Sequence, residues 1–258
     1  MKLFDSHCHI DDKSFNNDLL NVIENARKED VRSAMVVGVT KKSSEKAVEI
    51  ADKYENIYAS VGIHPHDAKN CDENTLEDLI KLSKKSCVKA WGETGLDFNR
   101  MFSDQNDQEK CFIRQLEIAD SLELPLIFHE RDSEGRFLEI LKTTHTKSRR
   151  GVVHCFSGNL DEMNEYLELG YYIGITGIIT IQKRGLTLRD LIHHIPKDKI
   201  LIETDAPYLT PAPQKNKSRR NEPAFVKSTF LKIADILNED IDSFSNIIWD
   251  NTVRLFKI

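Results

Sequence analysis

Two histidines separated by a single residue stand close to the N-terminus, in the segment Leu-Phe-Asp-Ser-His-Cys-His-Ile at residues 3–10. In a β-strand the side chains of residues i and i+2 project from the same face, so a strand here presents His7 and His9 side by side. Two imidazoles on one rigid strand form half of a metal site and need further ligands from elsewhere in the chain. Taken alone, the pair is equally compatible with two histidines that only form hydrogen bonds.

Residues of ligand type recur at the ends of later apolar runs. They are Glu93, His129, His154 and Asp205. With the first pair they make four imidazoles and two carboxylates, which is too many ligands for one tetrahedral zinc. A carboxylate can bridge two cations with its two oxygens, so the sequence predicts two divalent metal ions that share Glu93. We assign His7, His9, Glu93 and Asp205 to the first ion and Glu93, His129 and His154 to the second.

Mixed nitrogen and oxygen ligation suits zinc, manganese or, less well, magnesium. Two such cations can activate a water and stabilise both the attacking and the leaving oxygen of a displacement. Glu93 is therefore expected to act in catalysis as the bridge, and Asp205 to orient the water and accept its proton. Asp5 and Glu203 precede ligands by two residues; they either orient imidazoles through hydrogen bonds or serve as plain buried hydrogen-bonding groups.

The elements that must position these residues alternate regularly along the chain. Apolar runs rich in β-branched residues predict strands at 3–9, 33–39, 58–63, 88–93, 125–129, 151–156, 171–176 and 200–205. Amphipathic patterns predict helices at about 15–29, 43–54, 74–86, 104–122, 133–146, 160–169, 185–194, 222–237 and 240–256. Eight such strands favour a (β/α)8 barrel, with the metal site at the C-terminal ends of the strands.

Composition limits the class of protein. The chain has 258 residues, of which 40% are hydrophobic and 30% charged, and residues 1–258 are expected to form one barrel domain. We expect no membrane span, because no apolar run approaches about 20 residues, and no secretory signal is evident. Five scattered cysteines without C-x-x-C spacing indicate reduced thiols and a cytoplasmic protein. The net charge of −6 argues mildly against sequence-independent coating of nucleic acid.

The motifs around these ligands resemble those of TatD-family metal-dependent deoxyribonucleases, in family order from residue 3 to residue 223. The matching segments are LFDSHCH at 3–9, GIHPHDA at 62–68, GETGLD at 92–97, HCFSG at 154–158, ETDAPYLTP at 203–211 and RNEP at 220–223. The resemblance implies a barrel of the amidohydrolase superfamily that hydrolyses DNA phosphodiesters with divalent metal, often as a 3′-to-5′ exonuclease. It also implies that Glu93 stands where many relatives in the superfamily carry a carboxylated lysine.

The sequence departs modestly from the family pattern, at Thr94, Glu130 and Ser133. These departures concern substrate preference more than hydrolysis. The predicted catalytic rim is basic, and its cations could bind the non-scissile phosphates of a DNA strand together with His64 and His66. The cations are Arg131, Lys183, Arg184, Lys215, Lys217, Arg219 and Arg220.

Two alternatives stay open for the rim. For each single lysine of residues 214–221 a flexible, solvated loop is the favoured explanation, and Arg220 either binds phosphate or fixes the loop through Glu222. Phe98 and Tyr208 are the candidates for stacking against bases.

Three hypotheses for function follow. The first is a cytoplasmic two-metal phosphodiesterase that acts on DNA ends or on single-stranded DNA. The second is a small-molecule amidohydrolase or lactonase that uses the same metal centre. The third is a barrel that has lost catalysis, against which the retention of all six ligands argues. The basic rim favours phosphate over a neutral amide, and no pattern in the sequence indicates the oligomeric state.

Overall fold

Eight parallel strands form a single sheet in the computed structural model, which describes residues 1–258. The strands follow one another in chain order, and each pairs with the next. They are β1 (Leu3–Cys8), β2 (Val31–Val37), β3 (Ile57–Val61), β4 (Val88–Asp97), β5 (Leu126–Arg131), β6 (Gly151–Val153), β7 (Tyr172–Ile175) and β8 (Ile200–Ile202). Cys8 of β1 forms a parallel bridge with Ala206, just beyond β8, so the sheet curls into a nearly closed barrel. The expected (β/α)8 fold is confirmed.

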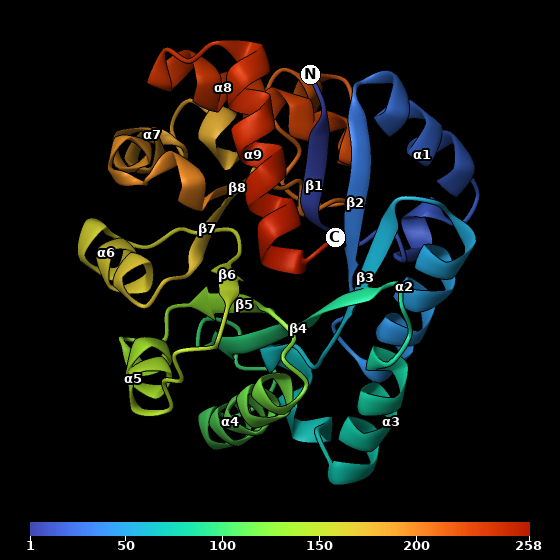
Figure 1. Ribbon diagram of the computed structural model, residues 1–258, viewed down its shortest axis with the longest axis vertical. Helices are drawn as coiled ribbons and strands as arrows, with labels where there is room; N and C mark the ends of the chain where they lie inside the picture. The colour runs from blue at the N-terminus through green and yellow to red at the C-terminus, as the bar shows by residue number, and fades with distance from the viewer.

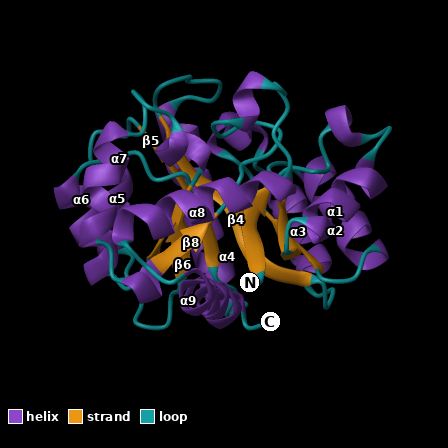
Figure 2. Ribbon diagram, turned by 90° about the horizontal axis from the view of Figure 1, so that it is seen from above, coloured by secondary structure: helices purple, strands orange, loops and turns teal.

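Helices surround the barrel in chain order, from α1 to α8, as Figure 1 shows. They are α1 (Leu19–Lys28), α2 (Lys41–Lys53), α3 (Glu73–Ser83), α4 (Gln105–Ser121), α5 (Arg136–Thr143), α6 (Leu160–Glu168), α7 (Leu186–Leu191), α8 (Val226–Leu237) and α9 (Ile241–Phe256). None of them is long and apolar enough to cross a membrane. In the view of Figure 2, α9 and both termini lie on one side of the strands and many of the connecting loops on the other.

Two hydrophobic cores hold these layers together. The larger one, of 55 buried residues, includes apolar residues of the strands and of the helices that cover them. The smaller one contains residues from seven of the eight strands, and Leu255 and Phe256 of α9 pack against it. Phe4 of β1 lies in this second core, with its ring 6.4 Å from that of Phe256. The terminal helix therefore contributes to the core inside the barrel.

The strands differ in length at the end where the candidate site lies. The apolar run of residues 88–93 predicts the start of β4, but the strand continues to Asp97, because Thr94 to Asp97 pair with Phe128 to Arg131 of β5. In contrast β6 and β8 have only three residues each, so His154 and Asp205 lie in the loops just beyond them.

Two of the predicted helices are also shorter than expected. The helix expected at 133–146 is confined to α5, and the one at 185–194 to α7 and a 3₁₀ turn. Several of the other helices begin at a side-chain cap, such as Thr40 before α2, Asp104 before α4 and Asn159 before α6. Each cap accepts a hydrogen bond from a free backbone N–H of the first turn and so fixes where the preceding loop ends.

Candidate metal centre

A polar cavity of about 570 Å³ lies at the C-terminal ends of the strands. Of its sixteen lining residues only Val39 and Tyr208 are hydrophobic. Five of the six predicted ligands line it, and the sixth, His7, is fully buried beside Glu93. The barrel mouth therefore brings together residues that are almost 200 positions apart in the sequence.

Glu93 lies at the centre of the cluster, and each of its two oxygens faces a different set of imidazoles. On one side, Oε2 is 3.4 Å from His7 Nε2 and 3.8 Å from His9 Nε2. On the other side, Oε1 is near three rings: His129 Nδ1 at 2.7 Å, His154 Nε2 at 3.2 Å and His64 Nε2 at 3.5 Å. A carboxylate placed in this way can serve two groups of ligands at once.

The second carboxylate, Asp205, lies on the His7 and His9 side. Its Oδ1 is 3.4 Å from His9 Nε2 and 3.8 Å from His7 Nε2. Its backbone N–H donates to the carbonyl oxygen of His7 over 2.9 Å, which ties the β8 loop to the end of β1. Asp205 therefore lies where the sequence-based assignment puts it, next to the first pair of histidines.

The donor atoms form three compact groups that could hold a metal ion. These are His7, His9 and Glu93; His7, His154 and Asp205; and His64, Glu93 and His129. The grouping differs from the expected one at two positions. His154 stacks on His7, with ring centroids 3.8 Å apart, and so lies close to both sides of the cluster. His64, expected to contact substrate, lies among the ligands because the chain beyond β3, which ends at Val61, brings its Nε2 to 3.2 Å from His129 Nδ1.

The electrostatics of the mouth depend on these imidazoles. Four carboxylates form ion pairs with these imidazoles, Glu93, Asp97, Glu203 and Asp205, and their only charged partners are histidines. Burial alone raises the pKa of Glu93, but the neighbouring His154, His64 and His7 outweigh it and hold this pKa well below its usual range. Buried carboxylates that have no lysine or arginine partner need another source of positive charge.

The surroundings of the imidazoles shift their pKa values in opposite directions. Burial lowers the pKa of His64 to about 4, with the nearby His129 acting in the same sense. Burial also opposes protonation of His9, but its bond to Asp205 and that carboxylate's charge raise its pKa to about 9. Burial and the nearby His154 lower the pKa of His7. A neutral imidazole is the form that binds metal.

Two groups behind the cluster, the carbonyl of Val37 and the carboxylate of Glu203, fix the orientation of two of its rings. His9 donates from Nδ1 to the carbonyl oxygen of Val37, at 3.0 Å, which leaves Nε2 facing Glu93 and Asp205. His154 Nδ1 lies 3.2 Å from Glu203 Oε1, which leaves Nε2 facing Glu93. Glu203 thus has the orienting position expected from the sequence. Such partners select the ring tautomer and raise the basicity of the free nitrogen.

Asp97 is a member of the site that the sequence reasoning did not select. It is buried at the end of β4, and its Oδ2 accepts from His66 Nε2 at 2.8 Å and from His129 Nε2 at 3.3 Å. Its Oδ1 accepts from the backbone N–H groups of Asn99 and Arg100. Although burial raises the pKa of Asp97, the bonds from His129 and His66 lower it far more. The signal that could have found Asp97 was its place at the end of the GETGLD motif.

Two buried glutamines of α4 hold the strand ends in place and were also missed. Gln108 accepts from the N–H of Asp97 at 2.8 Å and donates to its carbonyl oxygen at 3.0 Å. Gln115, two helical turns further along, makes the same pair of bonds to Ile63, directly before His64. Polar residues seven positions apart on the buried face of an amphipathic helix were the available signal.

Of the two roles expected for Asp5, the structure shows the second, a buried hydrogen-bonding group that contacts no imidazole ring. Its two oxygens accept from the N–H and the hydroxyl of Thr204, at 2.8 and 2.6 Å, so it joins β1 to the β8 loop. The cause is the strand geometry: the side chain of Asp5 meets the chain just beyond β8. Complete burial raises the pKa of Asp5 to about 8, although the bonds from Thr204 oppose the rise.

The predicted substrate contacts divide into two sets. His66 and Arg131 line the cavity, and Arg131 is 46% exposed there. Arg220 is not among the lining residues, because its guanidinium forms two bonds with Asp18, at 2.9 and 2.6 Å, and lies over the Phe15 ring. It fixes the loop, as the alternative proposed, but through Asp18 and not Glu222. Arg100 lines the cavity and was not predicted.

Two glycines make room for the cluster. Gly95 has φ +151°, and a Cβ there would lie 1.8 Å from the carbonyl oxygen of His129, so only glycine lets β4 pass this closely. At Gly174 of β7 a Cβ would lie 2.6 Å from Glu203 Oε2. Because neither glycine has a Cβ, the first leaves space for the backbone of His129 and the second for the carboxylate of Glu203.

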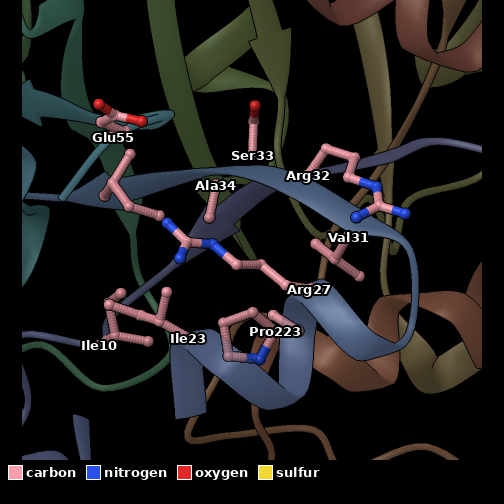
Figure 3. Close-up of a pocket in the computed structure, with 11 residues that line it drawn as sticks. Ile10, Ile23, Arg27, Val31, Arg32, Ser33, Ala34, Glu55 and Pro223 are labelled. Atoms are coloured by element: carbon pink, nitrogen blue, oxygen red, sulfur yellow. The ribbon is translucent and has the colours of Figure 1, made fainter. Parts of the chain in front are cut away.

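A second hollow, shown in Figure 3, lies between α1, β2 and Pro223. It has a volume of only about 20 Å³, room for about one water. None of the predicted site residues lines it, and Ile10, Ile23 and Val31 make part of its wall apolar. The chemistry of the protein therefore belongs to the cavity in the barrel mouth.

Comparison with known protein families identifies the chain. The model of the family described as TatD related DNase matches residues 4–257. The chain belongs to this TatD family. A protein from Pectobacterium parmentieri named 3′-5′ ssDNA/RNA exonuclease TatD is 37% identical over 259 residues, which cover 99% of this chain and all of the relative. A protein of the same name from Citrobacter koseri is 39% identical, over 99% of each chain.

Solved structures of TatD proteins have the same fold. A TatD family hydrolase from Entamoeba histolytica superimposes with a TM-score of 0.89 at 26% identity, over 99% of this chain and 98% of the other. A TatD homologue from Escherichia coli K12 gives a TM-score of 0.89 at 28% identity, with the same coverage. The donor set of this TatD chain also fits divalent metal, because imidazole nitrogens and carboxylate oxygens gather in compact groups that contain no lysine or arginine.

Proposed function

We propose that this TatD-family chain is a divalent-metal-dependent exonuclease that removes nucleotides from the 3′ ends of single-stranded DNA. The observation that carries the proposal is the position of Glu93 between two sets of imidazoles, on the floor of an open polar cavity. The names of the curated relatives support the direction of cleavage and the single-stranded substrate. Residues 1–258 act as one barrel domain, and the five unpaired cysteines support a cytoplasmic location.

Two metal ions are the proposed cofactor, with zinc, manganese or magnesium as candidates. His7, His9, Glu93 and Asp205 would hold the first ion; Glu93, His129 and His154 would hold the second, with His64 beside them. Bound metal supplies Lewis acidity and a water that ionises near neutral pH. Glu93 would serve both sites, because its two oxygens face opposite groups of imidazoles.

The residues of the chain have separate tasks in hydrolysis. Asp205 lies at the rim, partly accessible and beside His9, where it accepts the proton of the attacking water. Glu203 and Asp97 keep His154 and His129 in their rotamers, so that the ligand nitrogens face the cavity without reorganisation.

The phosphates on either side of the reacting one need cationic partners. Arg131, Arg100 and His66 line the cavity and can donate to phosphate oxygens. His66 Nε2 lies 2.8 Å from Asp97 Oδ2, and this bond fixes the orientation of the His66 ring. These contacts bind the strand and contribute no sequence readout.

The direct test is cleavage of a single-stranded oligonucleotide labelled at its 5′ end, after chelation and after addition of each metal. Stepwise shortening of the labelled strand, dependent on metal, supports the proposal. The same preparation is offered RNA, duplex DNA, and a panel of amides and lactones. Turnover of an amide or lactone without cleavage of any nucleic acid would favour the small-molecule hydrolase instead.

A further inference from the structure

Two loops at the barrel mouth carry an unusual excess of positive charge. Residues 176–185, after β7, and residues 206–221, after β8, together contain six lysines and arginines and no aspartate or glutamate. The chain as a whole has a net charge of −6, so the excess is local. Ion pairing to Asp18 occupies only one of the six, Arg220.

Between these loops lies a groove of about 380 Å³, separate from the metal cavity. Its apolar part is formed by Ile178, Ile181 and Leu209. Thr210 and three cations, Arg184 from one loop and Lys215 and Arg219 from the other, complete its lining. All three cations are exposed, and none is paired with a carboxylate. Unpaired cations around an apolar floor suit a ligand that has both phosphates and bases.

The walls of the groove are tied to each other and to the barrel. Thr180 accepts at its hydroxyl from the N–H of Ala212, at 2.8 Å, which connects the two loops. Arg189 of α7 donates to the carbonyl oxygens of Ile179 and Ile181, at 2.9 and 3.1 Å, and so shapes the first loop. The groove is therefore part of the folded structure, built by hydrogen bonds that do not involve its three cations.

One residue connects the groove to the metal cavity. Tyr208 lines the cavity and the next residue, Leu209, lines the groove. The Tyr208 ring is 56% exposed, with its centroid 6.2 Å from that of His9. Its carbonyl oxygen accepts from the buried Asn221 side chain, which holds the backbone here. An exposed aromatic ring between two sites can stack with a base of a strand that spans them.

We propose that this groove binds the backbone of a single-stranded polynucleotide on the 5′ side of the bond that is cleaved. Arg184, Lys215 and Arg219 contact successive phosphates, and the strand reaches the metal cavity past Tyr208. This inference rests on the proposed exonuclease function and adds a second, remote binding site to it. It makes cleavage depend on substrate length, because a dinucleotide cannot occupy the groove.

The test compares the triple variant Arg184→Ala, Lys215→Ala, Arg219→Ala with the unchanged protein on a 15-mer and on a dinucleotide. We expect kcat/KM for the 15-mer to fall by about tenfold or more through KM, with kcat unchanged. The salt dependence of binding should lose a slope of about 2, since each phosphate contact on a single strand contributes about 0.7. Turnover of the dinucleotide should stay within twofold.

The matched control replaces three exposed lysines near the opposite ends of the strands. They are Lys28 at the C-terminal end of α1, Lys84 directly after α3, and Lys147 between α5 and β6. It removes the same charge, and 15-mer cleavage should change by less than twofold. An unchanged KM in the groove variant, or an equal effect of the control, would overturn the proposal. Equal losses on 15-mer and dinucleotide would overturn it as well, because they would mean that the loops support the metal cavity.

Binding to a fluorescent 15-mer, measured by anisotropy in the Asp205→Asn background, separates the two proposals. Suppose that the unchanged protein cleaves no nucleic acid but the groove residues still control 15-mer binding. The proposed exonuclease function is then refuted, and the proposal that the groove binds a polynucleotide is supported. If cleavage occurs but the groove variant binds and cleaves the 15-mer normally, only the groove proposal is refuted and the exonuclease proposal stands.

Discussion

Replacement of Asp97 by asparagine tests whether this buried carboxylate sets the affinity of the metal centre. The change keeps the shape of the side chain and the Oδ1 that accepts from the backbone of Asn99 and Arg100. It replaces Oδ2 by an amide that cannot accept from His66 and His129. The fold should survive, because the bonds of Gln108 to the backbone of Asp97 are unaffected.

The expected loss of metal affinity depends on whether His66 or His129, the two partners of Asp97, is a metal ligand. Only His129 is a proposed metal ligand, and its bond to Asp97 is long, 3.3 Å against 2.8 Å for His66. Loss of a carboxylate that orients a ligating histidine costs about 10–100-fold in metal affinity. The long bond puts the expected loss near tenfold, which is about 1.4 kcal/mol. The lost bond to His66 should separately raise KM for the oligonucleotide.

Calorimetric titration of the metal-free protein with manganese or zinc measures the affinity, and thermal unfolding checks the fold. The matched control is Asp120→Asn, which removes the carboxylate that Arg149 binds at 3.0 and 2.6 Å in another part of the protein. That variant should lose stability and keep its metal affinity. Metal affinity and KM that stay at the level of the unchanged protein in Asp97→Asn would refute the reasoning.

The remaining predictions concern catalysis, the loop and pH. Asp205→Asn should lower kcat by about 10²–10⁴-fold or more with nucleic-acid affinity nearly unchanged, and near-normal single-turnover cleavage by the folded variant would remove Asp205 from the mechanism. Arg220→Ala should lower the free energy of unfolding by about 1 kcal/mol, because the bonds to Asp18 are lost. The salt dependence of oligonucleotide binding should not change, and a weaker salt dependence would show that Arg220 contacts phosphate after all. Activity should fall on the acid side as imidazoles are protonated and release metal, and added metal should move this limb to lower pH; a limb indifferent to metal would indicate another titrating group.

The fold was predictable from the sequence because the strands of a parallel barrel are buried on both faces. Each such strand is a near-continuous apolar run, and these runs gave all eight strands in the right order. The ends of the strands were less predictable. β4 continues through Glu93 to Asp97, four residues beyond its apolar run, because pairing with β5 stabilises polar residues there. Asp97 was overlooked for that reason.

The candidate site was predictable where a residue lies at the end of its strand, as His9, directly after β1, and His129, near the end of β5, show. It was not predictable where the partner is distant in the chain. Arg220 binds Asp18, and Asp5 binds Thr204, in contacts between segments about 200 residues apart that no local pattern encodes. His64 was expected to bind phosphate together with His66, and only the closed barrel places it beside His129.

The central claim is that two divalent ions share Glu93 and are both needed for cleavage. The most direct measurement is the activity of metal-free protein on a labelled oligonucleotide as metal is added in known equivalents per chain. The account predicts no cleavage without metal and full activity only as the second equivalent binds, with Glu93→Gln inactive at all ratios. Full activity without metal, or with a single equivalent, would contradict it.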